Sequence, residues 1–417
     1  MSERIPTYDW SNHEGPTSQV KASVFPVEID DETLRDGLQG IQLESHPSLE
    51  KKRIYLRLAS QFVDHADIGF PGSEELHKKE IAQLISFVEA RNLGISLSAA
   101  ARGAMKSDIE PIIDISHGLD GYRLEADIFL DSSSLRAKVE GWDRSEKFKQ
   151  LRDNISLLHK HNLPVMFVAE RATSTSPEEL GEVFQIAADL GVERLCIADT
   201  QGRANHRAIQ NIFRWSFSEF AQKFPDIKWD AHFHNGRGLG ISNCLIASEE
   251  GVDRVHATSF CIGEGPGNAD LATLLINLNL SGYRDKDLRE LNKFSRIASE
   301  LLEFPISSNA PVIGKSSFAT GSGVHAAALH KEASLNGEVG IYFPFPPGDV
   351  GATPDVRVGP FSGAHNVYLV LKRLQIEPTE EIVQAILAEA KEQRNLLIDE
   401  TIIGITQQFL NGEKQKI

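Results

Sequence analysis

The stretch Lys228-Trp229-Asp230-Ala231-His232-Phe233-His234 decides the fold, because it lies between two helix-like runs at residues 206–223 and 241–250. If it is a strand, its side chains alternate, so Asp230, His232 and His234 share one face while Ala231 and Phe233 share the other. The two imidazoles then converge on one point, and neutral imidazole is the commonest protein ligand of a divalent metal. A pair of hydrogen-bonded histidines in a loop is the alternative interpretation.

The same alternation of a short apolar run and a longer helical pattern occurs eight times along the chain. The predicted strands are residues 24–29, 66–70, 95–99, 121–130, 164–170, 194–199, 228–234 and 254–260. The predicted helices are residues 49–63, 73–91, 106–117, 144–161, 177–190, 206–223 and 241–250, and an eighth begins near residue 269. Parallel strands need a crossover that a helix usually supplies, so the pattern predicts an α/β fold, a (β/α)8 TIM barrel. An open doubly wound sheet is the alternative, although no Gly-x-Gly-x-x-Gly follows the first strand.

Three parts are predicted along the chain. Residues 1–20 have the composition of an irregular arm, and residues 21–283 form the barrel. Beyond residue 283 the strand–helix alternation stops. Helical patterns follow at 285–303, 364–374 and 379–395, with glycine- and proline-rich loops between them. Residues 284–417 are therefore predicted to be a smaller, mainly helical C-terminal module.

Composition limits the classes of partner. The 417 residues carry a formal net charge of -16, with 59 acidic and 43 basic side chains. This balance argues against nucleic acid or an anionic membrane surface as a partner, and it is otherwise typical of solubility. The three cysteines form no CxxC pair, and the first 20 residues lack the apolar run of a signal peptide. Both observations favour a reducing, cytoplasmic location.

Polar side chains follow the predicted strands repeatedly, at the end where TIM barrels carry their active sites. These residues are Arg35, Asp36, Arg102, Glu170, Asp199, Thr200, His232, His234, Glu264 and Asn268. Such a concentration of acids, amides, histidines and arginines on one rim is hard to explain as solvated surface. A candidate active site is therefore predicted there.

A metal held by His232 and His234 needs further ligands. The Asp36 carboxylate and the Asn268 amide oxygen can supply them, which suits Zn²⁺, Mn²⁺, Fe²⁺ or Mg²⁺ without choosing among these ions. Beside such an ion, Arg35 can stabilise an alkoxide that develops on a carbonyl substrate. An Arg35–Asp36 ion pair that closes a turn before Gly37 is the alternative.

Several short motifs together resemble one enzyme superfamily. In chain order they are Glu32-Thr33-Leu34-Arg35-Asp36-Gly37-Leu38-Gln39, Gly69-Phe70-Pro71, Ala198-Asp199-Thr200-Gln201-Gly202, His232-Phe233-His234-Asn235, Gly263-Glu264 with Gly267-Asn268, and Ser322-Gly323-Val324-His325. The chain is thus similar to the metal-dependent acyltransferases and lyases that include 2-isopropylmalate synthase, homocitrate synthase, citramalate synthase and, more distantly, hydroxymethylglutaryl-CoA lyase. The synthase branch is the nearer one. Its members condense acetyl-CoA with a 2-oxo acid in a Claisen-type reaction that yields a 2-hydroxy acid and CoA.

The resemblance implies a role for each matching residue. Asp36, His232, His234 and Asn268 would ligate a divalent metal, Mg, Mn or Zn, and acetyl-CoA would be the co-substrate. Arg35 would polarise the keto oxygen, and Gln39 and Thr200 would position the oxo acid, with Arg102 on the same rim grouped with them. Glu170 and His325 would enolise acetyl-CoA, with Tyr342 nearby. In the synthases the second-module histidine comes from the neighbouring subunit, so a homodimer is implied.

Departures from the family pattern leave the substrate and part of the chemistry open. Gly236 replaces an aspartate after the histidine motif, and Gly265 stands where an arginine usually follows Gly-Glu. Ser174 replaces an arginine that binds a distal carboxylate in some members. The alternatives to a synthase are a carbon–carbon lyase of the hydroxymethylglutaryl-CoA lyase type and a metal-binding paralogue without catalytic activity.

Overall fold

The computed structural model describes residues 25–43, 45–332 and 342–414, so the predicted arm at residues 1–20 lies outside the described residues. The described chain divides into two compact units. Residues 25–286 and 294–305 form the first unit, and the remaining described residues form the second. No helix in the described ranges is long and apolar enough to cross a membrane.

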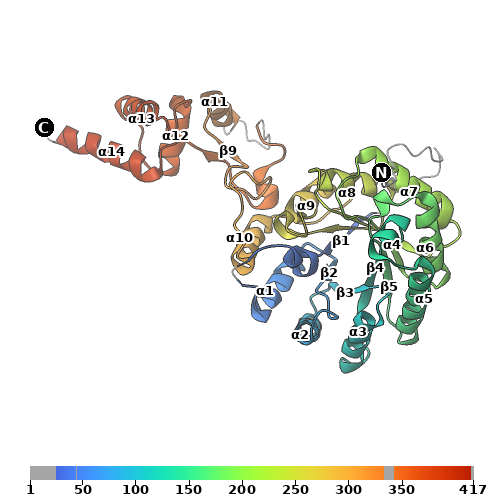
Figure 1. Cartoon of the computed structure of the whole chain (residues 1–417). Helices are drawn as coiled ribbons and strands as arrows, with labels where there is room; N and C mark the ends of the chain where they lie inside the picture. The colour runs from blue at the N-terminus through green and yellow to red at the C-terminus, as the bar shows by residue number, and fades with distance from the viewer. Residues whose placement is uncertain (1–24, 44, 333–341, 415–417) are drawn as a thin grey trace. The chain divides into compact units, whose positions relative to one another are not determined.

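Eight parallel strands close into a barrel in chain order, which confirms the predicted TIM barrel (Figure 1). The strands are β1 (Glu28–Asp31), β2 (His65–Asp67), β3 (Ser96–Arg102), β4 (Glu125–Leu130), β5 (Val165–Ala169), β6 (Arg194–Asp199), β7 (Lys228–Phe233) and β8 (Arg254–Ala257). The barrel closes where β1 pairs with β8, in a register that sets Glu28 opposite Arg254 and Asp30 opposite His256. Because all strands run in the same direction, their carboxyl ends meet at one rim.

Helices form the outer layer around the strands (Figure 1). They are α1 (Leu49–Ala59), α2 (Glu75–Arg91), α3 (Lys106–Gly118), α4 (Ser134–Glu140), α5 (Arg144–Lys160), α6 (Pro177–Asp189), α7 (His206–Ser216), α8 (Gly240–Glu250), α9 (Leu271–Leu280) and α10 (Leu291–Leu302). Several start where a Ser, Asp or Asn side chain accepts a first-turn N–H, as Ser48, Asp143, Ser176, Asn205 and Asp270 do. Such caps satisfy amides that have no partner within the helix, so they set where each helix begins.

The apolar core lies between strands and helices. Trp229 of β7, for example, packs edge-on against Phe184 of α6 and Phe217 beyond α7, with ring centroids 5.7 and 5.4 Å apart. Many side chains inside the barrel are charged, whereas most TIM barrels fill this space with branched apolar residues. Arg254 contacts Glu125 across the interior at 2.6 Å, and Arg194 contacts Glu28 at 2.5 Å. The charged interior also explains the misplaced first strand. The apolar run at residues 24–29 was predicted, but β1 is the acidic stretch Glu28–Asp31, which overlaps only the last two residues of that run.

The second unit has its own small core. Strands β9 (Ala319–Thr320) and β10 (Asp355–Val356) pair in parallel. Helix α11 (Gly323–Glu332) lies between them in the sequence, and α12 (Ala364–Arg373), α13 (Glu380–Gln393) and α14 (Asp399–Lys414) come after β10. Its buried residues are Val358, Val367, Val370, Leu371, Ile382, Val383, Ile386, Leu387, Ala390, Leu397 and Ile402. The mainly helical character predicted for this region is confirmed, and α14 is an additional helix that the sequence pattern did not predict.

Candidate active site

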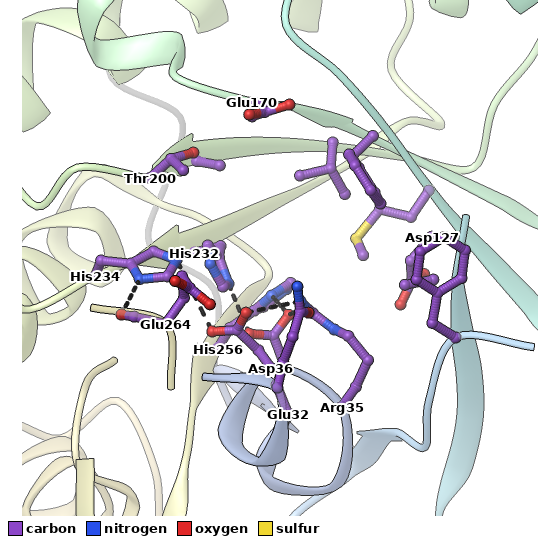
Figure 2. A pocket seen from close by; sticks show the side chains of 17 residues that line it. Glu32, Arg35, Asp36, Asp127, Glu170, Thr200, His232, His234, His256 and Glu264 are labelled. Carbon is purple, nitrogen blue, oxygen red and sulfur yellow. Dashed lines mark hydrogen bonds and ion pairs between the residues drawn. The ribbon is translucent and has the colours of Figure 1, made fainter. Parts of the chain in front are cut away.

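A cavity of about 250 Å³ opens at the carboxyl-terminal rim of the barrel (Figure 2). Eight of the residues singled out from the sequence line it: Arg35, Asp36, Gln39, Glu170, Thr200, His232, His234 and Glu264. They come from the ends of β1, β5, β6, β7 and β8 or the loops that follow these strands. Strand alternation and barrel closure together therefore bring these side chains, distant in sequence, to one place.

Asp36, His232 and His234 form a cluster that can hold a metal ion. One donor atom from each lies within 4.8 Å of the other two, and all three residues are buried. His234 Nε2 is 3.9 Å from Asp36 Oδ2. Burial lowers the pKa of His234, which favours the neutral imidazole that a metal requires.

Asn268 lies against the same carboxylate. Its Nδ2 donates to Asp36 Oδ2 at 2.5 Å, while its Oδ1 is buried and has no hydrogen-bond partner among the described residues. Gly263 packs against this hydrogen-bonded pair, because a Cβ built at this glycine would lie 3.0 Å from both Asn268 Nδ2 and Asp36 Oδ2. An amide oxygen without a partner, beside two imidazoles and a carboxylate, matches the donor set of a divalent cation.

Arg35 occupies one turn of π-helix, Thr33–Gly37, directly after β1. Its guanidinium contacts three carboxylates: Glu32 at 2.7 Å, Asp67 at 2.6 Å and Asp36 at 3.0 Å. The predicted Arg35–Asp36 ion pair is thus present, and Arg35 also lines the cavity, so the two interpretations of this pair are compatible. Held from three sides, the guanidinium has a fixed orientation toward the cavity.

Glu32 and His256 connect the metal-ligand cluster to the barrel interior. Glu32 Oε2 lies 2.6 Å from His232 Nδ1, and Glu32 Oε1 lies 3.1 Å from His256 Nδ1. Burial would raise the pKa of Glu32, but His232 and Arg35 hold it well below its usual range. Burial alone would lower the pKa of His256, but contacts that include Glu32 and Asp230 raise it to about 10. A carboxylate on Nδ1 leaves Nε2 of His232 as the atom available to a metal.

These two residues were not predicted as part of the site. Glu32 lies within the quoted motif, directly after β1 and two positions beyond Asp30, and this spacing was a signal that it faces inward. His256 alternates with Arg254 on β8 in the same way. A closed barrel pairs the first strand with the last, but the register that brings Glu32 to His256 came only from the structure.

Glu170 and Thr200 lie on the opposite wall from Asp36 (Figure 2). The Glu170 carboxylate is 3.6 Å from the Arg136 guanidinium and retains 23% side-chain exposure. Burial raises its pKa above the usual glutamate value, and Arg136 opposes this shift. Thr200 Oγ1 accepts the Arg171 N–H at 3.0 Å, which fixes the hydroxyl at the end of β6.

Arg102 does not line the cavity. Its guanidinium donates to both carboxylate oxygens of Asp108, at 2.6 and 2.9 Å, and the side chain is half exposed. Strand β3 does end at Arg102, but the bidentate pair directs the guanidinium to the start of α3. The structure therefore gives Arg102 a contact that stabilises the β3–α3 connection in place of the predicted position at the cavity wall.

His325 and Tyr342 belong to the second unit, where they contact each other. Their rings stack with centroids 3.9 Å apart, and His325 Nδ1 lies 3.2 Å from Thr320 Oγ1. The side chain of Tyr342 is exposed. The two residues grouped from the sequence, although 17 positions apart, are therefore neighbours in the fold.

The remaining wall of the cavity is apolar. It consists of Phe70, Ala100, Phe129, Met166, Val168 and Ala198, with Asp127 at one edge. Arg35 is the only arginine or lysine among the described lining residues. A ligand is thus offered a polar end near Asp36 and an apolar surface beyond it.

Packing explains why Gly236 stands where the family pattern has an aspartate. A Cβ at Gly236 would lie 2.1 Å from the Gln201 carbonyl oxygen, and a Cβ at Gly202 would lie 2.1 Å from the Gly236 amide nitrogen. Gly202 also has φ +59°, a conformation that favours glycine. The loops after β6 and β7 therefore touch through their backbones, and this backbone has no room for an aspartate at position 236.

The fold and the site define a TIM-barrel protein with a candidate divalent-metal centre at the carboxyl ends of its strands. Within that class, the model of the HMGL-like family matches residues 26–299. The chain belongs to this family, which confirms the resemblance to the metal-dependent acyltransferase and lyase superfamily.

Similar proteins include two kinds of synthase, 2-isopropylmalate synthases and homocitrate synthases. The chain is 32% identical over 360 residues to 2-isopropylmalate synthase of Methanocaldococcus jannaschii, covering 85% of this chain and 65% of that protein. It is 27% identical over 377 residues to homocitrate synthase of Sulfolobus acidocaldarius, covering 89% and 76%. The chain thus spans about two thirds of the length of that isopropylmalate synthase. The structure of hydroxymethylglutaryl-CoA lyase from Pseudomonas aeruginosa shares the fold, with TM-score 0.57, 16% identity and coverage of 74% of this chain and 99% of that one.

Proposed function

We propose that this protein condenses acetyl-CoA with a 2-oxo acid in a Claisen-type reaction that depends on a divalent metal and yields a 2-hydroxy acid and CoA. The observation that carries the proposal is the cluster of Asp36, His232 and His234 beside Arg35, across the cavity from Glu170. The similarity to synthases of both kinds supports the same chemistry.

Mg²⁺, Mn²⁺ or Zn²⁺ would be held by Asp36, His232 and His234, with the Asn268 oxygen as a further donor. The buried Oδ1 of Asn268 and the 4.8 Å grouping of the other donors fit such an ion. When bound, the ion supplies Lewis acidity toward the keto and carboxylate oxygens of the oxo acid. Glu32 orients His232 for this role through the 2.6 Å contact to Nδ1.

The side chains around the cluster would orient the oxo acid. Arg35 presents a permanent positive charge where the keto oxygen becomes an alkoxide, and its three carboxylate contacts hold it in place. Gln39 and Thr200 line the cavity and offer hydrogen bonds to the substrate carboxylate. Orientation of both reacting groups lowers the entropic part of the barrier.

Glu170 is the proposed base for the acetyl group. Its carboxylate removes a proton from the thioester methyl, the resulting carbanion forms a bond to the keto carbon, and the alkoxide takes up a proton. Water then cleaves the thioester, releasing the CoA thiol and a carboxylate. The elevated pKa of Glu170 makes its carboxylate a stronger base than an exposed glutamate.

His325 and Tyr342 are proposed to complete this machinery from the second unit of a neighbouring subunit, which requires a homodimer. The stacked rings fix their mutual geometry. An imidazole beside a phenol can take up or deliver a proton while the enolate is shielded from water. The second unit would thus contribute to the active site.

The cavity favours an oxo acid with an apolar side chain. Phe70, Phe129, Met166 and Val168 form the wall beyond the polar end, and Ser174 binds Gln201 where some relatives carry an arginine. Arg203 Nη1 donates to Ser174 Oγ at 3.4 Å but does not line the cavity, so a second carboxylate on the substrate would lose water and meet no arginine or lysine besides Arg35 among the described lining residues. Branched aliphatic 2-oxo acids fit this wall better than 2-oxoglutarate.

Thiol release from acetyl-CoA, measured with a panel of 2-oxo acids and Mg²⁺, Mn²⁺ or Zn²⁺, tests the proposal. We expect turnover with aliphatic oxo acids, at least about tenfold lower kcat/KM with 2-oxoglutarate, and no turnover by Asp36→Asn. Cleavage of a 3-hydroxyacyl-CoA without any condensation would instead establish the lyase reaction. Metal binding without either reaction would indicate a paralogue that has lost catalysis.

A further inference from the structure

Below the cavity, the barrel interior holds a second group of metal-ligand side chains. Asp30 of β1, His65 of β2 and Asp127 of β4 each place one donor atom within 4.8 Å of the other two. They are 0, 4 and 4% exposed. None of them belongs to the cluster of Asp36, His232 and His234, and no motif of the sequence pointed to them.

The donor atoms in this group lack partners. Both carboxylate oxygens of Asp127, Asp30 Oδ2 and His65 Nε2 are buried and have no hydrogen bond among the described residues. The other oxygen of Asp30 is occupied, because it accepts the Asp67 N–H at 3.1 Å. Leaving a buried polar atom unpaired is destabilising, and more so for a charged group. Three neighbouring side chains with unpaired buried donor atoms call for an occupant.

The nearby cations do not fill this role. Arg254 contacts Asp230 and Glu125, and His256 contacts Glu32 and Asp230 at 3.1 and 3.0 Å. His256 Nε2 comes no nearer to Asp30 Oδ2 than 3.9 Å, and His65 Nε2 has Glu125 Oε1 at 3.5 Å. The carboxylates of Asp30 and Asp127 therefore have no hydrogen-bonded cation of their own among the described side chains.

We propose that Asp30, His65 and Asp127 bind a second divalent transition-metal ion, of the Mn²⁺ or Zn²⁺ class, in the barrel interior. Ligands of one such ion, with bonds of about 2.0–2.2 Å, lie at most about 4.4 Å apart, so side-chain shifts of a few tenths of an ångström complete the site. Two carboxylates and one imidazole favour these ions over Ca²⁺, which prefers oxygen ligands alone.

An entry path exists, because Asp127 also lines the 250 Å³ cavity (Figure 2). Burial raises the pKa of Asp30 to about 7 and that of Asp127 well above its usual range. Burial thus disfavours the charged carboxylates, and a bound cation would offset this effect. The site is independent of the proposed condensation, since its residues take no part in that reaction.

Mn²⁺ titration of the metal-free full-length protein, followed by the electron paramagnetic resonance signal of free Mn²⁺, tests the proposal. We expect two equivalents bound per chain in the wild type, and one each in His65→Ala, Asp127→Asn and Asp36→Asn. His206→Ala, which removes an exposed histidine at the start of α7, is the matched control and should bind two. Circular dichroism checks that each variant is folded.

The outcomes separate the two sites. A single equivalent in the wild type that is lost in Asp36→Asn and retained in His65→Ala and Asp127→Asn would overturn the second site and leave the first intact. If the interior variants do not fold, anomalous diffraction from wild-type crystals soaked in Mn²⁺ replaces them. A peak between His65 and Asp127 supports the proposal, whereas a peak at His232 and His234 alone contradicts it.

Discussion

Burial sets the protonation behaviour of Glu170, which faces the metal-ligand cluster across the cavity (Figure 2). If its carboxylate is the base, activity needs the deprotonated form and is lost as pH falls through its pKa. Because that pKa is raised, the acidic limb of kcat/KM lies at higher pH than an ordinary glutamate, with a usual value of 4.5, would give. We expect Glu170→Gln to lower kcat by about 10²–10⁴-fold and to remove this limb.

The pH profile distinguishes this role from a structural one. Glu140→Gln alters an exposed carboxylate that shares Arg136 at 3.1 Å, so it is the matched control and should keep the limb. An acidic limb that persists unchanged in Glu170→Gln would exclude Glu170 as the base. Metal content should be the same in both variants, because neither residue contacts the cluster.

For individual residues, the sequence predicted correctly those that alternate on one strand or follow a strand end. His232 and His234 are two positions apart, so one local rule places both. Glu32, His256 and Asp127 were missed because their roles depend on the register between strands and on the side chains that meet inside the barrel. Arg102 shows a second limit of the sequence. Its backbone lies at the predicted strand end, but its side chain binds Asp108 and so does not enter the cavity.

Among the structural elements, the loops after β6 and β7 depend on a backbone contact at Gly236. A methyl group there would overlap the Gln201 carbonyl oxygen, so we expect Gly236→Ala to reduce the free energy of unfolding by about 1–3 kcal/mol. Gly118→Ala is the control, because its Cβ meets nothing within 4 Å and alanine favours the α3 helix. Denaturant unfolding of the two variants measures the difference.

The loop contact has a functional counterpart. Thr200 precedes Gln201 and His234 precedes Asn235, so movement of these loops displaces both cavity walls. Gly236→Ala should therefore raise KM for the oxo acid as well as lower stability. Equal stability of the Gly236→Ala, Gly118→Ala and wild-type proteins would contradict the close approach.

Elements with a strong pattern were predicted well. Helices α3, α6 and α8 and strand β6 lie within a residue or so of their predicted limits. Helix α4, at Ser134–Glu140, was missed because seven residues provide too short a stretch for helical periodicity to show. Strand β1 was displaced toward the apolar residues before it, because a strand with acidic side chains directed inward contradicts the usual pattern.

At the scale of the whole molecule, the proposed catalytic groups are divided between two compact units. If His325 serves the barrel of a neighbouring subunit, mixing two inactive variants, Glu170→Gln and His325→Ala, should restore part of the activity after subunit exchange. In the mixed dimer an intact barrel meets an intact second unit. Each variant alone should stay inactive at the same total protein concentration.

The mixing experiment also has a clear negative result. If activity does not return although mass spectrometry detects mixed dimers, His325 serves its own chain or takes no part. If no dimer forms at all, the proposed assembly is wrong. The sequence predicted that His325 and Tyr342 belong together, and their stacked rings agree, but it offers no physical rule that sets which subunit they serve.

The charged barrel interior affects how the chain folds. Glu28 meets Arg194, and Arg254 meets Glu125, only when strands far apart in sequence have come together, and such non-local pairing forms slowly. Until closure, the inner face of the unfinished sheet presents hydrated carboxylates and guanidinium groups to water. Intermediates of large proteins aggregate through exposed apolar surface. Below the apolar cavity wall this inner face offers little of it, so an incompletely closed barrel should remain dispersed long enough for its first and last strands to meet.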